Sequence, residues 1–219
     1  MRPPPRAGSE TLFVDGSAGR IETVIDLPAS QSAGPALRGV ALIAHPHPLF
    51  GGTLDNKVVQ TLAKTFAELG YAAIRSNFRG VGDTDGVHDH GEGETADMLT
   101  LAAWARSRFA AGSDLPVAAA GFSFGAWIQT RLAERMKLQR LVLVALPAGF
   151  VSDGRSYTTG TVPADSIVIH GEQDETVPLA NVLDWARPQP LAISVIPGAD
   201  HFFHRKLKLI RTIIQGQWK

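Results

Sequence analysis

Ser123 lies at the centre of the run Gly-Phe-Ser-Phe-Gly, residues 121–125. An apolar stretch, residues 116–120, precedes this run, and residues 126–132 after it have helical spacing. The pattern is typical of a nucleophile elbow, a tight strand-to-helix turn that holds a serine hydroxyl clear of a sheet. The alternative is a small residue in an ordinary tight turn. Because a strand and a helix flank the run, we predict that Ser123 is a catalytic nucleophile.

Two further candidates follow apolar stretches later in the chain: Asp174 comes after residues 166–170, and His201 comes after residues 191–196. A serine hydroxyl needs a histidine to accept its proton during attack. The histidine in turn needs a carboxylate to hold its orientation and stabilise its charged form. Since the carboxyl ends of parallel strands meet at one edge of a sheet, we expect Ser123, Asp174 and His201 to form a catalytic triad.

Other residues near the same strands compete for these roles. The rival acids are Asp165, Glu172 and Asp184, and the rival base is His204. Asp165 precedes its strand, whereas the expected acid follows one. An aspartate after a strand can also be a simple turn residue that bonds its own backbone. His204 is better placed as a surface residue at the start of a helix.

Acyl transfer also needs N–H donors for the oxygen that becomes negatively charged. In a nucleophile elbow one donor is the backbone N–H of the following residue, here Phe124. The second comes from the loop after the third strand, here His-Pro-His-Pro-Leu-Phe-Gly-Gly at residues 45–52. The prolines have no N–H. The backbone N–H of His47 is therefore the predicted second donor, with that of Leu49 as the alternative.

The elements that would position these residues alternate between strands and helices. Strands are predicted at residues 11–15, 21–27, 39–44, 71–76, 116–120, 141–145, 166–170 and 191–196, and helices at residues 56–69, 94–109, 126–132, 179–186 and 204–214. This alternation predicts an α/β fold with a mostly parallel central sheet and helices on both faces. The first two strands read as an antiparallel hairpin. We expect residues 1–10 to be a flexible tail and residues 11–219 to form a single domain.

The composition is that of an ordinary globular protein, with 219 residues, 44% hydrophobic and 19% charged. The 21 Lys and Arg residues balance 21 Asp and Glu residues, so no basic excess favours nucleic acid or an anionic membrane. Without cysteine, disulfides, a thiol nucleophile and a cysteine zinc site are excluded. The opening residues lack the apolar core of a signal peptide, and no apolar run approaches the length of a membrane span. We expect a cytoplasmic protein.

Taken together, these residues resemble the α/β-hydrolase superfamily over nearly the whole chain. His45 and Pro46 stand where the family usually has His-Gly, and residues 77–84, Asn-Phe-Arg-Gly-Val-Gly-Asp-Thr, match its usual Asp-x-Arg-Gly-x-Gly-x-Ser loop, with Asn for Asp and Thr for Ser. The His-Pro-His-Pro run followed by Gly-Gly-Thr-x-Asp-Asn-Lys-Val-Val is similar to a small, capless bacterial branch of predicted hydrolases and carboxylesterases. The resemblance implies that the serine, aspartate and histidine named above form the triad, with no metal and no organic cofactor.

In this superfamily a cap is usually inserted after the strand that ends near residue 145. Here residues 146–165 are too few for a multi-helix cap, so we expect an open site. The candidate pocket residues are Leu49, Phe50, Phe122 and Arg79. Arg79 can either pair with a carboxylate of the substrate or pin its own loop.

These observations predict a serine hydrolase that cleaves carboxylic esters of short to medium acyl chains. A thioesterase or an acyltransferase would use the same triad, and a peptidase is disfavoured because no cap is present to recognise a peptide terminus. From a different class, the chain could be a non-catalytic binding protein on a hydrolase fold, although all three triad residues are intact. The expected partner is a small-molecule ester, with no nucleic acid and no membrane, bound by a monomer or homodimer.

Two histidine-containing segments, residues 45–47 and residues 88–92, invite a metal interpretation because imidazole and carboxylate groups are good ligands. Such spacing also recurs by chance, and two histidines alone bind a metal weakly. We therefore expect loops with solvated polar residues and no metal at these positions.

Overall fold

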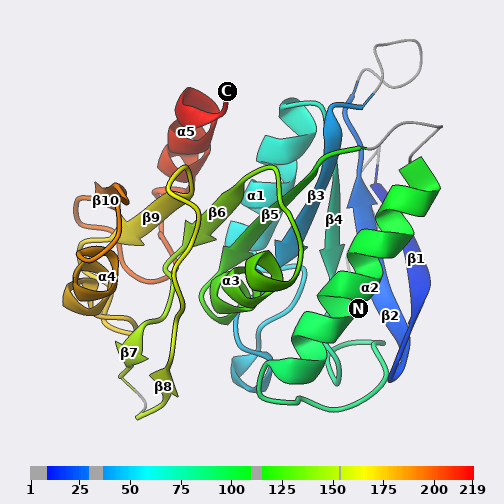
Figure 1. The fold of residues 1–219 in the computed structure, drawn as a ribbon, viewed down its shortest axis with the longest axis horizontal. Helices are drawn as coiled ribbons and strands as arrows, with labels where there is room; N and C mark the ends of the chain where they lie inside the picture. The colour runs from blue at the N-terminus through cyan, green and yellow to red at the C-terminus, as the bar shows by residue number, and fades with distance from the viewer. Residues whose placement is uncertain (1–8, 30–36, 110–114, 153) are drawn as a thin grey trace.

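The computed structural model describes residues 9–29, 37–109, 115–152 and 154–219, and its centre is an eight-stranded sheet (Figure 1). The strands lie in the order β1-β2-β4-β3-β5-β6-β9-β10. They are β1 (Ser9–Gly16), β2 (Gly19–Asp26), β3 (Gly39–Ala44), β4 (Tyr71–Ser76), β5 (Val117–Phe122), β6 (Leu141–Val144), β9 (Ile167–Gly171) and β10 (Ile193–Ile196). Strand β2 pairs antiparallel with both β1 and β4, and the remaining pairs are parallel.

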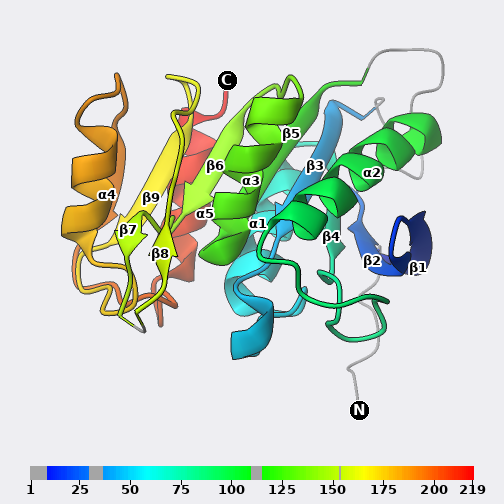
Figure 2. The same ribbon diagram turned by 60° about the horizontal axis from the view of Figure 1, so that its bottom comes forward.

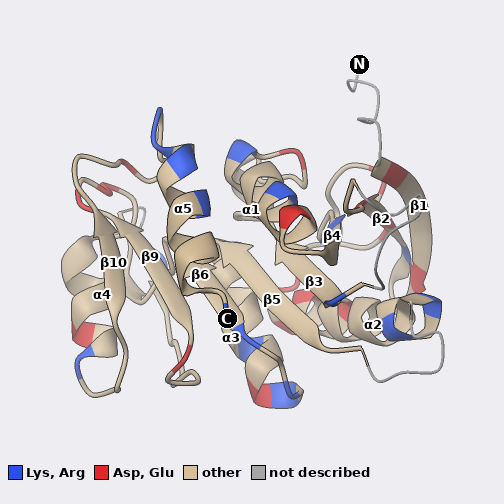
Figure 3. Cartoon of the chain, turned by 90° about the horizontal axis from the view of Figure 1, so that it is seen from above, with Lys and Arg blue, Asp and Glu red and all other residues tan. Residues whose placement is uncertain are grey.

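Helices cover both faces of this sheet (Figure 3). The helices α1 (Lys57–Glu68) and α5 (Leu207–Gln217) pack on one face, and α2 (Glu92–Phe109), α3 (Phe124–Arg135) and α4 (Leu179–Ala186) pack on the other. Strands β3, β4, β5, β6 and β9 are buried along their whole length, which explains their continuous apolar runs. The predicted fold class, including the N-terminal antiparallel hairpin, is confirmed. No helix in the described part of the chain is long and apolar enough to cross a membrane.

The last helix begins three residues later than the predicted start at His204. Phe203 and Arg205 adopt positive φ values of 54° and 61°, and non-glycine residues enter this region only as single residues, not as helices. The segment therefore turns before it can wind into α5. At the other end, the predicted tail falls mostly outside the described residues, and Ser9 and Glu10 already belong to β1.

The connection between β6 and β9 contains a small hairpin where the sequence predicted only a loop. Its strands β7 (Gly149–Phe150) and β8 (Ser156–Tyr157) pair antiparallel. This hairpin lies at the carboxyl ends of the parallel strands, at the same end of the sheet as the loops after β3 and β4. Figure 2 shows this end turned toward the viewer. The described part of the connection, residues 146–152 and 154–165, contains no helix.

Candidate active site

Ser123 occupies a strained turn between β5 and α3. Its φ of 55° and ψ of −124° lie outside the regions that side-chain-bearing residues prefer, at a cost of about 1–3 kcal/mol. A hydrogen bond of 2.9 Å from its N–H to the carbonyl of Val144 anchors the turn to β6. A Cβ atom on Gly125 would lie 2.4 Å from the carbonyl oxygen of Ala44. Glycine at that position therefore allows α3 to start close against the end of β3.

The loops after β9 and β10 bring Asp174 and His201 to this serine. Nε2 of His201 lies 3.1 Å from Oγ of Ser123, and Nδ1 lies 2.8 Å from Oδ2 of Asp174. The other oxygen of Asp174 accepts the N–H groups of Thr176 and Val177 at 3.0 and 2.7 Å. The aspartate and histidine are buried while the serine is partly exposed. An arrangement of this kind can pass a proton from a hydroxyl to an imidazole that a carboxylate holds in place.

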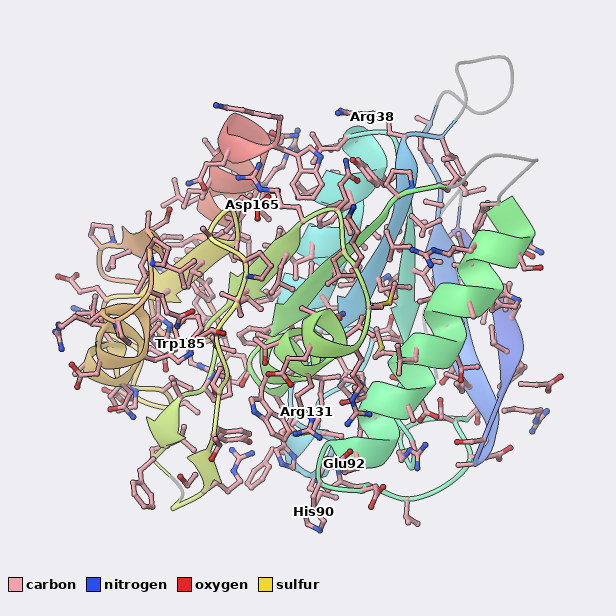
Figure 4. All side chains as sticks on the ribbon, viewed as in Figure 1. Arg38, His90, Glu92, Arg131, Asp165 and Trp185 are labelled. Carbon is pink, nitrogen blue, oxygen red and sulfur yellow. The ribbon has the colours of Figure 1, made fainter. Side chains whose placement is uncertain are left out.

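The rival acids lie elsewhere. Asp165 sits near the amino end of β9, at the opposite end of the molecule from His90 and Glu92 (Figure 4). Asp184 lies on α4 and forms a surface ion pair with Arg187. Glu172 is exposed, and its carboxylate accepts a backbone N–H of the loop after β10 at 2.7 Å. Of the candidate acids, Asp174 is the one that contacts His201.

His204, the rival base, points into solvent. Its side chain is 72% exposed, and its Nδ1 lies 2.6 Å from a carboxylate oxygen of Asp200. Asp200 also accepts the backbone N–H of His204. The pair therefore shapes the turn before α5 and lies apart from the serine.

His170 is a buried neighbour of Asp174 that the sequence reasoning did not single out. Its Nε2 lies 2.9 Å from the carbonyl oxygen of Val177 and 3.5 Å from Oδ2 of Asp174. Burial lowers the pKa of this imidazole despite the nearby carboxylate, so the ring is neutral and donates its Nε2–H to the carbonyl. This bond holds the loop that carries Asp174. The signal in the sequence was a histidine at the end of an otherwise apolar strand.

The two predicted oxyanion donors belong to neighbouring residues. The rings of His47 and Phe124 lie 4.7 Å apart, and Phe124 opens helix α3. The short 3₁₀ helix η1 (Pro48–Phe50) follows His47. The N–H of Leu49, the alternative donor, is directed to Nδ1 of His47 at 3.2 Å. The backbone N–H of His47 therefore remains the stronger prediction.

Residues 77–84 tie the loop after β3 to the sheet. The side chain of Asn77 accepts the N–H of Leu54 at 2.8 Å and donates to the carboxylate of Glu22 on β2 at 2.6 Å. The hydroxyl of Thr84 donates to the carbonyl of Asn77 and accepts the N–H of Glu22, both at 3.0 Å. The Asn and Thr that replace the usual Asp and Ser of this motif therefore each donate and accept a hydrogen bond that ties these loops together.

The structure divides the four predicted pocket residues. Leu49 and Phe50 are 68% and 64% exposed, so both can contact a ligand. Phe122 is fully buried with its ring 5.1 Å from that of His201, so it packs against the imidazole and has no exposed surface with which to line a pocket. The guanidinium of Arg79 forms two hydrogen bonds of 2.9 and 2.8 Å with Asp97 on α2. Arg79 thus pins its own loop, and its fork is not open to a substrate carboxylate.

The β7–β8 hairpin contacts the loop after β3. The guanidinium of Arg155 lies 4.3 Å from the ring centre of Phe50 and donates to the hydroxyl of Tyr157 at 2.7 Å. The ring of Tyr157 lies 5.3 Å from that of Trp127 on α3. An open groove of about 430 Å³ separates this hairpin from α4, on the side where Trp185 is labelled (Figure 4).

The histidine-containing segments also meet near the site. The ring of His88 lies 4.9 Å from that of His47 and 5.5 Å from that of Phe124. Its Nδ1 lies 2.8 Å from the buried carboxylate of Glu94, although the two are not aligned as a hydrogen bond. Among the described residues, no group of three or more His, Asp or Glu side chains is placed to hold a metal ion. The side chain of His88 is thus packed beside the site, where the sequence predicted a solvated one, whereas Asp89 and His90 of the same loop are exposed.

Comparison with known proteins shows the family to which this chain belongs. The model of the X-Pro dipeptidyl-peptidase (S15) family matches residues 15–177. The chain belongs to this family of α/β hydrolases. The S15 match includes Ser123 and Asp174 and ends before His201.

Two similar solved structures are described as α/β serine hydrolases, one of them without a lid, and a further relative is uncharacterized. An α/β serine hydrolase without a lid from Xanthomonas campestris is 34% identical, with a TM-score of 0.83 over 99% of this chain and 96% of that one. A serine hydrolase homologue from Coxiella burnetii is 36% identical, with a TM-score of 0.82 over 94% and 96% of the two chains. An uncharacterized protein of Rickettsia prowazekii is 31% identical over 89% of this chain and 82% of its own length. The chain therefore belongs to the α/β serine hydrolase family.

Proposed function

We propose that this serine hydrolase cleaves carboxylic esters of short to medium acyl chains through an acyl-enzyme on Ser123. The observation that carries the proposal is the pair of contacts made by His201, at 3.1 Å to the serine oxygen and 2.8 Å to Asp174. Both distances lie within hydrogen-bonding range for a nucleophile, its base and the group that orients the base.

In the proposed reaction, Nε2 of His201 accepts the proton of Ser123 while the serine oxygen attacks the acyl carbon. The backbone N–H groups of His47 and Phe124 hold the oxygen that becomes negatively charged, and one such donor contributes about 2.7–4 kcal/mol to the barrier reduction. His201 then returns the proton to the departing alcohol. Water, activated by the same imidazole, releases the acid and restores the serine.

Exposed apolar side chains near the site favour a substrate with an apolar acyl group. Leu49 and Phe50 project from the loop after β3, Phe150 from the hairpin and Phe202 from the position next to His201, with exposed fractions between 48% and 73%. The ring of Phe202 lies 5.2 Å from that of His201. Burying such side chains against an acyl chain is favourable at about 25 cal/mol per Å².

A peptidase is the second candidate, because the family description names X-Pro dipeptidyl peptidases. Release of a dipeptide requires recognition of a free peptide terminus. The described cover of the site consists of the two-residue strands β7 and β8, which offers less surface for that recognition than a cap. We therefore rank the ester first and test both substrates together.

The test is hydrolysis of p-nitrophenyl esters of increasing acyl length, beside acyl-thioesters and an Xaa-Pro p-nitroanilide. Ser123→Ala provides the catalytic variant and Ser107→Ala, an exposed serine on α2, the matched control, with folding checked by circular dichroism. We expect ester turnover that peaks at one chain length, survives in Ser107→Ala and is lost in Ser123→Ala. Faster turnover of the anilide would establish the peptidase, and equal activity in both variants would remove Ser123 from the mechanism.

A further inference from the structure

His45, at the end of β3, is fully buried with both ring nitrogens engaged. Its Nδ1 lies 2.6 Å from the carbonyl oxygen of Pro46, and its Nε2 lies 2.9 Å from the backbone nitrogen of Phe78. Neither contact involves the serine or a substrate. A histidine buried this completely without a part in the proton relay needs a separate explanation.

The partners decide where the proton of this imidazole lies. The N–H of Phe78 is a donor, so Nε2 must accept, and the carbonyl of Pro46 is an acceptor, so Nδ1 must donate. Burial lowers the pKa of His45 to about 3, outweighing the effect of the bond to Pro46. The ring therefore stays neutral and keeps this one tautomer throughout the pH range in which the protein would work.

The carbonyl of Pro46 and the N–H of His47 belong to the same peptide unit. That unit is planar, and in the trans form its C=O and N–H point in opposite directions. Fixing the carbonyl toward His45 therefore fixes the N–H of His47 on the opposite side. Gly52 closes the carbonyl in from another direction, since a Cβ atom there would lie 2.0 Å from the oxygen of Pro46.

We propose that His45 is a positioning residue whose Nδ1–H holds the 46–47 peptide in the orientation that aims the N–H of His47 at the developing oxyanion. The inference rests on the proposed function, in which that N–H is an oxyanion donor. An interaction realised in the transition state changes kcat, whereas loss of ordinary substrate binding changes KM. His45 variants that release the peptide should therefore lower kcat and leave KM nearly unchanged.

Two substitutions separate this role from a simple tether between β3 and the loop after β4. His45→Asn keeps a side-chain N–H donor near the position of Nδ1, where it reaches Pro46, and loses the acceptor for Phe78. His45→Gln keeps an acceptor near the position of Nε2 and loses the donor to Pro46. We expect His45→Asn to stay within about 10-fold of the wild-type kcat and His45→Gln to lose about 10²–10³-fold, as for removal of one oxyanion donor.

A second pair of variants acts on the same peptide from the other side and does not alter the histidine. Gly52→Ala pushes a methyl group against the oxygen of Pro46, whereas Gly51→Ala meets nothing within 4 Å although its φ of 76° is strained for alanine. We expect Gly52→Ala to lower kcat with KM nearly unchanged. Gly51→Ala should lower the melting temperature and leave kcat within about 2-fold.

The outcomes are distinguishable from failure of the proposed function. A wild-type protein that neither hydrolyses esters nor reacts with a fluorophosphonate would overturn that function and this inference with it. An active wild type with equal kcat losses in His45→Asn and His45→Gln, or losses that merely follow melting temperature, would overturn the role of His45 alone. A crystal structure of His45→Gln gives a readout independent of activity. A rotated 46–47 peptide supports the proposal, and an unchanged peptide contradicts it.

Discussion

The backbone of Gly125 lies so close to Gly121 that a Cβ atom on Gly121 would be 2.3 Å from the carbonyl oxygen of Gly125. Real Cβ atoms do not approach a backbone oxygen this closely, so glycine at the first position is a packing requirement. The contact closes the turn between β5 and α3. The same turn gives Ser123 its positive φ of 55°. The strained serine and the two glycines on either side of it therefore depend on one another.

Replacing Gly121 with alanine tests this steric argument. The methyl group would force the backbone of the elbow apart, and overpacking of this kind costs about 1–3 kcal/mol or more. Gly216→Ala is the matched control, because Gly216 lies in α5 and a methyl group added there would meet nothing within 4 Å. Alanine there should stabilise the helix by about 0.5–1 kcal/mol. Urea unfolding measures both, and equal stability of the two variants would contradict the argument.

Asp174→Asn should lower kcat by about 10⁴-fold while the protein stays folded. An asparagine oxygen can still accept the N–H groups of Thr176 and Val177, but the amide no longer stabilises a positively charged His201 and can favour its wrong tautomer. Steady-state kinetics on the preferred ester measure the loss. Glu172→Gln, a change of the rival acid two residues earlier, should leave kcat within about 2-fold. A larger effect at Glu172 than at Asp174 would reassign the acid.

Arg79→Met should destabilise the protein by about 3 kcal/mol, because it leaves the carboxylate of Asp97 buried without its partner. The pKa of Arg79 is raised by its hydrogen bonds to Asp97, in keeping with a structural ion pair. Adding Asp97→Asn to this variant should recover part of the loss in urea unfolding. The ratio of kcat/KM for a neutral ester and a carboxylate-bearing ester should stay the same. A selective loss for the charged ester would return Arg79 to the substrate pocket.

Acid should weaken the fold through His45. The unfolded chain protonates this histidine near pH 6.5, while the folded chain does so only at about pH 3. Between these values the unfolded state binds more protons, so the free energy of unfolding falls as the pH falls, by about 1.4 kcal/mol per pH unit for this group. Burial of His170 acts in the same direction. Urea unfolding at pH 6 and pH 5 gives the change of the free energy of unfolding with pH. This change should be smaller in His45→Asn than in the wild type, and an equal change in both proteins would refute the assignment.

Much of the fold follows from local patterns. The buried strands read as apolar runs, and α1 shows helical spacing through Val58, Leu62 and Phe66, all of them buried. The three residues proposed as the triad could be selected because each follows a strand, and the parallel sheet then brings the strand ends together. The order of these residues along the chain and their positions after strands are enough to select them, without any knowledge of side-chain contacts.

Other features depend on partners that are distant in the sequence. The N–H of Phe78 sets the tautomer of His45, and Asp97 on α2 holds the guanidinium of Arg79. No local motif reveals either partner. The hairpin β7–β8 has strands of two residues each, too short for an alternating pattern. The true start of α5 depends on two positive φ values, at Phe203 and Arg205, where the sequence offers no glycine to signal them.

The hairpin belongs to a connection whose two ends are held by neighbouring strands. Strand β6 pairs in parallel with β9, with Val142 opposite Ile167 and Val144 opposite Ile169. Segments inserted between β7 and β8 would extend the cover while this pairing keeps the sheet in register. Selectivity can therefore evolve, or be engineered, by exchanging one surface segment while the chemistry is inherited unchanged. The turn of the small hairpin is therefore a position at which longer segments over the site can be inserted without a change in the sheet.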